Sequence, residues 1–144
     1  MDVNLIYPAI LTNIITILLF LNSRLHDRYL LFFMIIGQLI LISGENDKNV
    51  DKIQTSHILF TLTIIIGSVY FNEKHNLVFI GILILLRFIT RYIYDDCLFL
   101  LSSNHREFDI EKDIHNYINW DIVFFISLLI ISFRLLKNYY FDNI

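Results

Sequence analysis

Two arginines four residues apart, Arg87 and Arg91, stand inside a stretch, residues 77–101, that is otherwise almost wholly apolar. A charged side chain at membrane depth costs about 2.5 kcal/mol or more, so its presence there indicates a function or a partner. With about 100° of rotation per helical residue, Arg87, Arg91 and Asp95 share one stripe roughly 80° wide. The spacing therefore predicts an ion pair between Arg91 and Asp95.

Arg87 then needs an acceptor on another helix. The candidates in the other apolar stretches are polar but uncharged: Gln38, Asn13, Thr12 and Thr16. Two interpretations stay open. In one, Arg87 faces the interior of a helix bundle and lines an anion or proton path; in the other, the arginines bend towards the headgroups or bind a lipid phosphate. A voltage sensor is disfavoured, because sensor helices carry several gating charges.

A second group of candidate residues lies in and just before the polar segment 102–119. It consists of the acidic and histidine side chains Asp96, His105, Glu107, Asp109, Glu111 and His115. Twice a histidine and a carboxylate stand four residues apart, which places both on one helix face, as metal ligation requires. HExxH is absent and such pairs arise readily by chance, so we favour solvated surface residues and predict no metal site. Apolar residues recurring at helical spacing predict an amphipathic interfacial helix over 102–119.

Sequence motifs of enzymes and channels are absent. The chain contains no GxSxG, no P-loop, no GxGxxG and no TVGYG-like filter. Cys97 is the single cysteine, so neither a disulfide within the chain nor a CxxC redox pair can form. Its default interpretation is a small buried hydrophobe. We therefore predict no cofactor and no catalytic residue, and an enzyme is the less favoured class of function.

The composition is that of a membrane protein. The 144 residues are 56% hydrophobic and 17% charged, with a mean hydropathy of +0.62, whereas soluble domains carry about 25% charged residues. The net charge of −3, without a clustered basic excess, excludes a nucleic-acid partner. The chain holds 27 Ile and 12 Asn but one Ala. That skew indicates codons rich in A and T, as in large DNA viruses, protists and organelles.

The apolar stretches predict the helices that must position these residues. A hydrocarbon layer about 30 Å thick needs roughly 20 helical residues. Stretches with few or no charges cover residues 3–22, 29–44, 55–72, 77–101 and 120–137. Their apolar runs are continuous, whereas the strands of a membrane barrel alternate apolar and polar residues. The predicted fold is an all-α transmembrane bundle, one integral-membrane domain over 1–144 with about five spans; four spans are the alternative.

The orientation follows from short basic loops, which stay on the cytoplasmic side. Arg24 and Arg28 fall in the tight loop after the first stretch, which favours an outer N-terminus and a cytosolic C-terminus. Eleven of the fourteen acidic residues then lie outside. They either solubilise the loops or form a surface that attracts cations or a partner.

Three functions are compatible with these residues. The favoured one is a structural or accessory component of a membrane assembly. The alternatives are a transporter or pore with a polar path near Arg87 and Arg91, and a membrane enzyme that uses the acidic and histidine group. The expected partners are the lipid bilayer and a protein partner or a second copy. Small side chains such as Thr63 and Gly67, four residues apart, let another helix approach closely.

Overall fold

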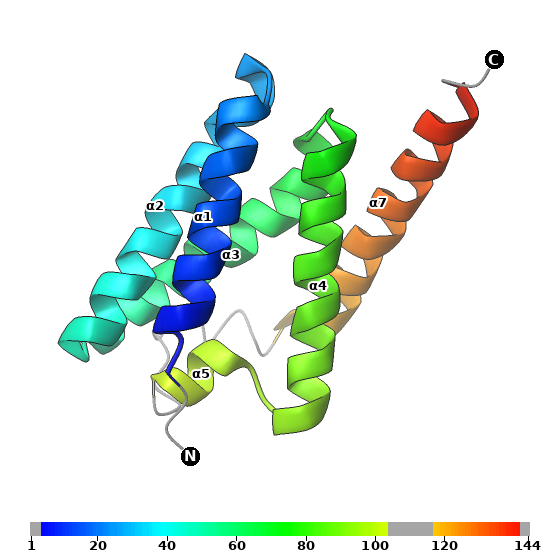
Figure 1. The fold of residues 1–144 in the computed structure, drawn as a ribbon. Coiled ribbons are helices and arrows are strands. Elements are labelled where there is room, and N and C mark those ends of the chain that lie inside the picture. Colours follow the sequence, from blue (N-terminus) through cyan, green and yellow to red (C-terminus); the bar gives the residue numbers. More distant parts are fainter. Residues whose placement is uncertain (1–3, 104–116, 142–144) are drawn as a thin grey trace.

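The computed structural model describes residues 4–103 and 117–141, and their secondary structure is entirely helical (Figure 1). Five helices have 17 or more residues, and a sixth, α5, has five. They are α1 (Ile6–Asn22), α2 (Leu25–Asp47), α3 (Val50–Tyr70), α4 (Lys74–Tyr94), α5 (Leu98–Ser102) and α7 (Trp120–Phe141). The all-α prediction is confirmed.

Three of these helices are long and apolar enough to cross a membrane. They are α2, α3 and α4, with 23, 21 and 21 residues. Helix α1 is also apolar but shorter, with 17 residues. The prediction of a membrane protein is thereby supported by length and composition.

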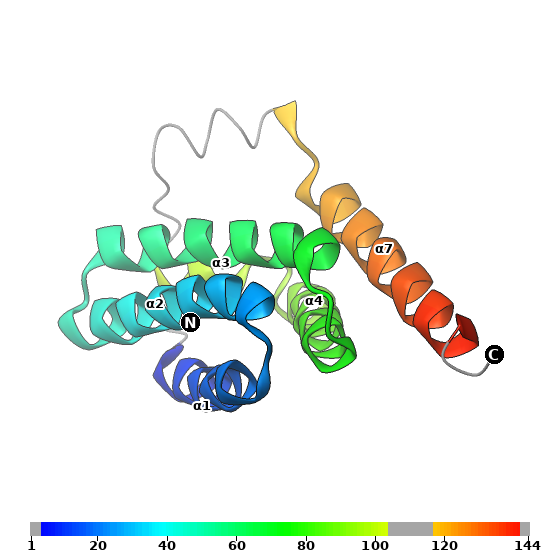
Figure 2. The same cartoon turned by 90° about the horizontal axis from the view of Figure 1, so that it is seen from above.

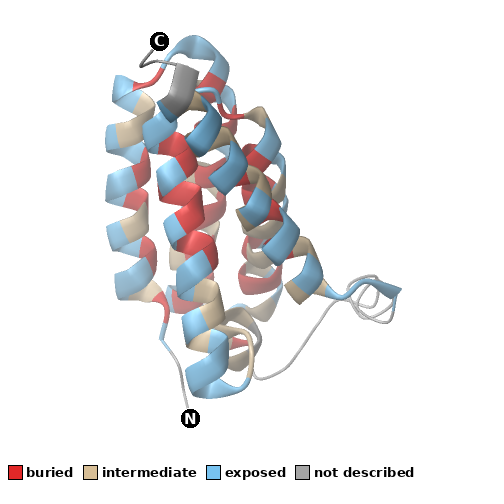
Figure 3. Ribbon diagram, turned by 90° about the vertical axis from the view of Figure 1, so that its right-hand side faces the viewer, coloured by how far each residue is buried: buried red, intermediate tan, exposed pale blue. Residues whose placement is uncertain are grey.

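The distribution of polar and apolar side chains is that of a bundle surrounded by lipid. Large apolar residues such as Leu11, Phe33 and Ile66 point outwards and are about half exposed. Polar residues such as Gln38 and Asn76 are buried between the helices. In Figure 3 the buried residues follow the inner face of each helix, while the exposed ones follow its outer face. Buried polar groups together with extensive exposed apolar surface indicate apolar surroundings, such as lipid.

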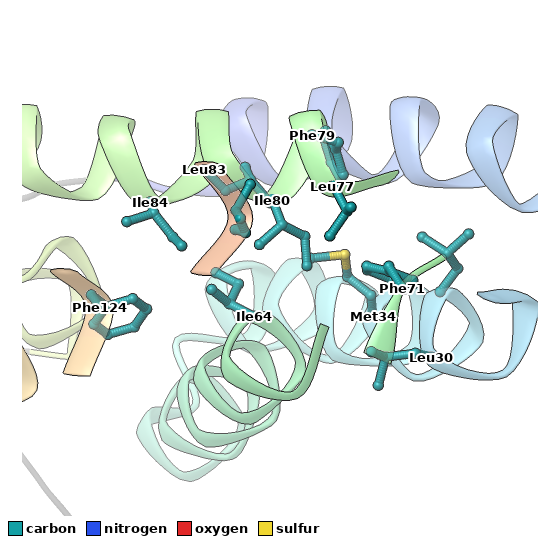
Figure 4. Close-up of a cluster of buried hydrophobic side chains, with 12 residues drawn as sticks. Leu30, Met34, Ile64, Phe71, Leu77, Phe79, Ile80, Leu83, Ile84 and Phe124 are labelled. Carbon is teal, nitrogen blue, oxygen red and sulfur yellow. The ribbon is translucent and has the colours of Figure 1, made fainter. Parts of the chain in front are cut away.

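The main core lies where α2, α3, α4 and α7 meet. Met34 of α2, Ile64 of α3 and Ile80 and Ile84 of α4 are buried there, and Phe124 brings α7 into the cluster (Figure 4). Seen from above, α1, α2 and α3 follow one another as layers, with α4 and α7 to one side of them (Figure 2). Helix α7 packs on α3 and α4, and the short α5 contacts the same two helices.

The helix expected over residues 77–101 ends early, at Tyr94. Asp95 adopts a left-handed conformation, with φ 58°, which stops the helix. Aspartate tolerates this conformation better than most residues do. The side chain of Asp96 then accepts a hydrogen bond from the backbone N–H of Cys97, at 2.7 Å. The chain therefore turns after α4, and α5 lies across the end of the bundle instead of prolonging α4 (Figure 1).

The close approach of α2 and α3 gives a first prediction. A Cβ atom on Gly44 would lie 2.9 Å from Lys52 Cβ and 3.0 Å from the backbone nitrogen of Ile53. We expect Gly44→Ala to lower the free energy of unfolding by about 1–3 kcal/mol, because overpacking forces the backbone to move. Unfolding by sodium dodecyl sulfate in mixed micelles, followed by circular dichroism, measures this change.

Gly81→Ala is the matched control for this variant. A Cβ atom there would lie 3.6 Å from Ile131 Cγ2, which is an ordinary contact. This variant should be neutral or more stable, because alanine favours a helix over glycine by about 1 kcal/mol. Equal losses at the two positions would contradict the packing described for α2 and α3.

Candidate functional site

A cavity of about 330 Å³ lies at the end of the bundle that contains the N-terminus of α1 and the C-terminus of α4. Its walls are almost entirely apolar and come from α1, α2, α3, α4 and α5, with Phe124 from α7. The volume falls in the range of about 300–1,000 Å³ that small-molecule sites occupy. Eight of its twenty lining residues carry a polar or charged side chain, among them Ser56, His57, Arg87 and Arg91, but these side chains present little polar surface to the cavity. An apolar cavity with a few polar groups is typical of a ligand site.

Helix α5 forms one wall of the cavity through Leu98 and Phe99. Two hydrogen bonds attach the end of α5 to the last turn of α2 and to the N-terminal part of α3. The hydroxyl of Ser102 donates to the buried carboxylate of Glu45, and the amide of Gln54 donates to the hydroxyl of Ser103. Each of these hydrogen bonds joins two side chains. The position of α5 at the cavity therefore depends on polar side chains inside the bundle.

The two arginines meet one carboxylate at the cavity. Arg87 and Arg91 both place Nη1 against Oδ1 of Asp121, at 2.9 and 3.0 Å. The guanidinium of Arg87 also lies 4.1 Å from the ring centroid of Phe124, a distance that permits a cation–π interaction. Arg87 is 18% exposed and Arg91 is 45% exposed. Two positive charges and one negative charge leave this group with an excess of +1.

Asp121, the acceptor for Arg87, was not among the residues predicted from the sequence. Its only signal was a single acidic residue beside Trp120, at the start of the last apolar stretch. The predicted partner of Arg91 was Asp95, but this residue is exposed at the left-handed end of α4. The carboxylate that Arg91 contacts is that of Asp121.

Three of the four uncharged candidates pair with one another instead of with Arg87, while the hydroxyl of the fourth, Thr12, donates to the backbone carbonyls of Pro8 and Ala9. Asn13 Nδ2 donates to Gln38 Oε1 at 3.1 Å, and Gln38 Nε2 donates to Thr16 Oγ1 at 3.1 Å. All three side chains are buried. Such hydrogen bonds between helices are worth about 0.6–2 kcal/mol in a membrane. They hold α1 against α2 and thereby fix one wall of the cavity, which Gln38 also lines.

The acidic and histidine group of the sequence analysis lies mostly outside the described residues. This applies to His105, Glu107, Asp109, Glu111 and His115. Asp96 is described, and its carboxylate accepts the backbone N–H of Cys97. In the described part of the chain, no group of three or more His, Cys, Asp or Glu side chains could hold a metal ion.

The structure also brings together two residues that sequence spacing could not connect. Cys97 Sγ lies 3.6 Å from Nε2 of His57, although the two residues are 40 positions apart. The ring of His57 stacks on that of Phe99, with centroids 4.8 Å apart. Cys97 and His57 both line the cavity.

A buried carboxylate organises the opposite end of the bundle. Asp27 is 1% exposed and accepts hydrogen bonds from the backbone of Asn72 and Glu73, both at 3.1 Å, and from Asn76 Nδ2, at 2.8 Å. His26 Nδ1 lies 3.0 Å from the same carboxylate. These contacts join the α1–α2 turn to the α3–α4 turn.

Asp27 stands in the first turn of α2, before the apolar part of that helix. Burial raises the pKa of its carboxyl group. The hydrogen bonds with His26, Asn76, Asn72 and Glu73 have the opposite effect, and together they hold the pKa below the ordinary value. Asp27 is therefore charged under physiological conditions, and its role in this arrangement is structural.

The arrangement can bind an apolar molecule more readily than it can conduct ions. The cavity walls are almost entirely apolar, and both arginines are already paired with Asp121. A polar path near Arg87 and Arg91 therefore receives little support from the geometry. The positive charge that Asp121 leaves unbalanced on Arg87 and Arg91 would instead complement an anionic group.

Comparison with families of known proteins, with curated proteins and with solved structures finds no match.

Proposed function

We propose that the protein is a small integral-membrane protein that acts as an accessory component of its membrane by binding a single-chain anionic amphiphile. The acyl chain occupies the cavity, and the anionic headgroup pairs with Arg91. The observation that carries this proposal is the combination of apolar walls with two arginines that share one carboxylate. Charge complementarity then favours a fatty acid over a neutral lipid of the same length.

Arg91 is better suited than Arg87 to hold the headgroup. It is the more exposed of the two, at 45% against 18%, and a guanidinium has five N–H donors, of which Asp121 engages Nη1. Arg87 packs on Phe124 and pairs with Asp121, and it thereby holds α4 against α7. Arg91 can therefore keep its contact with Asp121 and still donate to a carboxylate.

The proposal includes five crossing helices in one integral-membrane domain. Helix α1 would span about 26 Å at 1.5 Å per residue, and its 17 residues reach the lower limit of the range of about 17–25. Helix α7 has 22 residues, with Trp120 at one end and Lys137 and Tyr139 near the other, as expected of interfacial anchors. We also propose, from the basic residues Arg24 and Arg28, that the α1–α2 turn faces the cytosol and that the N-terminus and the cavity lie at the outer face.

Binding of dodecanoate to the purified protein in dodecyl maltoside tests the proposal. We expect saturable binding of dodecanoate by the wild type and binding at least tenfold weaker for Arg91→Gln. A hydrogen bond to a charged group is worth about 1.5–3 kcal/mol, which corresponds to about 10–100-fold in Kd. Both proteins are compared at one detergent concentration, so partition of the ligand into micelles cancels.

Arg24→Gln is the matched control, because Arg24 is exposed at the other end of the bundle. It should leave the Kd unchanged. Two further ligands test the alkyl chain and the negative charge separately: dodecanol has the alkyl chain without the charge, and inorganic phosphate has the charge without the alkyl chain. Each should bind at least tenfold more weakly than dodecanoate. Equal binding of dodecanol would contradict the role of Arg91, and binding of phosphate alone would indicate a free-anion site.

A further inference from the structure

The side chains of Cys97 and His57 lie together at the cavity and have the chemistry of a nucleophile and a base. Cys97 Sγ is 3.6 Å from His57 Nε2, which is hydrogen-bonding distance for sulfur. The stacking of Phe99 on His57 fixes the plane of the imidazole. A thiol becomes a strong nucleophile when an adjacent base removes its proton. Both side chains line the cavity, so a bound molecule can reach them.

Ser56 independently indicates that the cavity holds a ligand with a hydrogen-bonding group. It lines the cavity and is 1% exposed, and its hydroxyl has no hydrogen-bond partner among the described residues. The hydroxyls of Thr55, Thr63 and Ser68 donate to backbone carbonyls one turn earlier in the same helix. A buried hydroxyl without a partner is costly. A ligand oxygen in the cavity would remove that cost.

We propose that Cys97 is an acyl acceptor that takes the acyl chain from an acyl thioester, such as a fatty acyl-coenzyme A, bound in the cavity. This inference rests on the proposed function, because the chain must occupy the cavity. His57 removes the proton of the Cys97 thiol, and the sulfur attacks the thioester carbonyl carbon. The carbon–sulfur bond to coenzyme A breaks, and the leaving thiolate takes the proton from His57. The products are S-acyl Cys97 and free coenzyme A.

The chemistry needs no oxidant, metal or other reactant. One thioester is formed as another is broken, so the reaction exchanges one sulfur for another at the same carbonyl carbon. Ser56 precedes His57 on α3 and also lines the cavity. In the proposed reaction its hydroxyl donates to the carbonyl oxygen, which becomes negatively charged during the attack.

Incubation of the purified protein with dodecanoyl-coenzyme A in dodecyl maltoside tests this inference. Intact-mass spectrometry should show addition of one dodecanoyl group, removable by neutral hydroxylamine, and Cys97→Ser should show none. His57→Gln should react about 100-fold more slowly near pH 7, because a positioned base contributes about 10²–10⁴-fold. The rate of this variant should rise with pH, as thiolate forms without the base. Ser56→Ala should slow the reaction at least tenfold.

A control cysteine measures spontaneous acylation. Tyr92 is exposed on α4, so the double variant Tyr92→Cys, Cys97→Ser presents one thiol outside the cavity. We expect it to react at least 100-fold more slowly than the wild type. Equal rates for the two thiols, or a wild-type rate for His57→Gln, would overturn the inference.

Dodecanoate binding by Cys97→Ser separates this inference from the proposed function. If that variant binds dodecanoate with the wild-type Kd while the wild type is not acylated, only the acyl-acceptor role of Cys97 fails. If the wild type does not bind dodecanoate, the proposed function fails as well.

Discussion

Replacing Asp27 with alanine is expected to lower the free energy of unfolding by about 3 kcal/mol, because removing one partner of a buried charged network costs about 3–5 kcal/mol. The carboxylate is 1% exposed and accepts hydrogen bonds from Asn72, Glu73 and Asn76. Their N–H groups would lose their acceptor, and the two turns would separate. Unfolding by sodium dodecyl sulfate in mixed micelles measures the change.

Asp51→Ala is the control for this variant, because Asp51 also lies in the first turn of a helix but is exposed. Its effect should stay within about 0.5 kcal/mol. Acid gives a second test. The pKa of Asp27 is lowered in the folded protein, so its contribution to stability is present above the ordinary aspartate pKa of about 3.9 and is lost as the pH falls through the lowered value. A wild type that is no more sensitive to acid than Asp27→Ala would contradict this role.

Reducing the volume of the cavity should weaken binding without destabilising the fold. Ala9 lines the cavity from α1 and is 3% exposed. Leucine at this position would occupy space that we assign to the acyl chain. We expect dodecanoate binding to weaken at least tenfold, while the free energy of unfolding stays unchanged or rises by about 0.5–2 kcal/mol, as for other cavity-filling substitutions. Equilibrium binding and detergent unfolding, measured on the same preparation, check both outcomes.

Ala9→Ser is the control at the same position, since it changes polarity but adds little volume. It should bind dodecanoate within a few-fold of the wild type. Unchanged binding by Ala9→Leu would mean that the chain lies elsewhere. If Ala9→Leu lowered both the stability and the binding, the loss of binding would be explained by disrupted packing of α1 and not by a filled cavity.

The helices could be predicted from the sequence because a long apolar stretch is a local feature of the chain. Long apolar stretches predicted α2 and α3 within a few residues of their bounds. The end of α4 at Tyr94 could not be predicted, because no distinct sequence pattern indicates the left-handed conformation of Asp95. The apolar residues that continue beyond it also fit a longer helix.

The site was only partly predictable. Arg87 and Arg91 stood out because charge in an apolar stretch is unusual, and they do lie at the cavity. Their acceptor Asp121 was missed because it is 34 residues from Arg87, and such contacts depend on how the helices pack. The approach of His57 to Cys97 across 40 residues depends on the turn after α4 in the same way.

Photo-crosslinking of a dodecanoate that carries a diazirine on its chain tests the central claim most directly. The protein in dodecyl maltoside is irradiated with the probe, digested and mapped by mass spectrometry. The account predicts labels on cavity residues such as Phe60 and Leu83, removed by excess dodecanoate and reduced in Arg91→Gln. Labels spread over outward-facing residues such as Ile14, Ile66 and Ile82, unaffected by competitor, would contradict it.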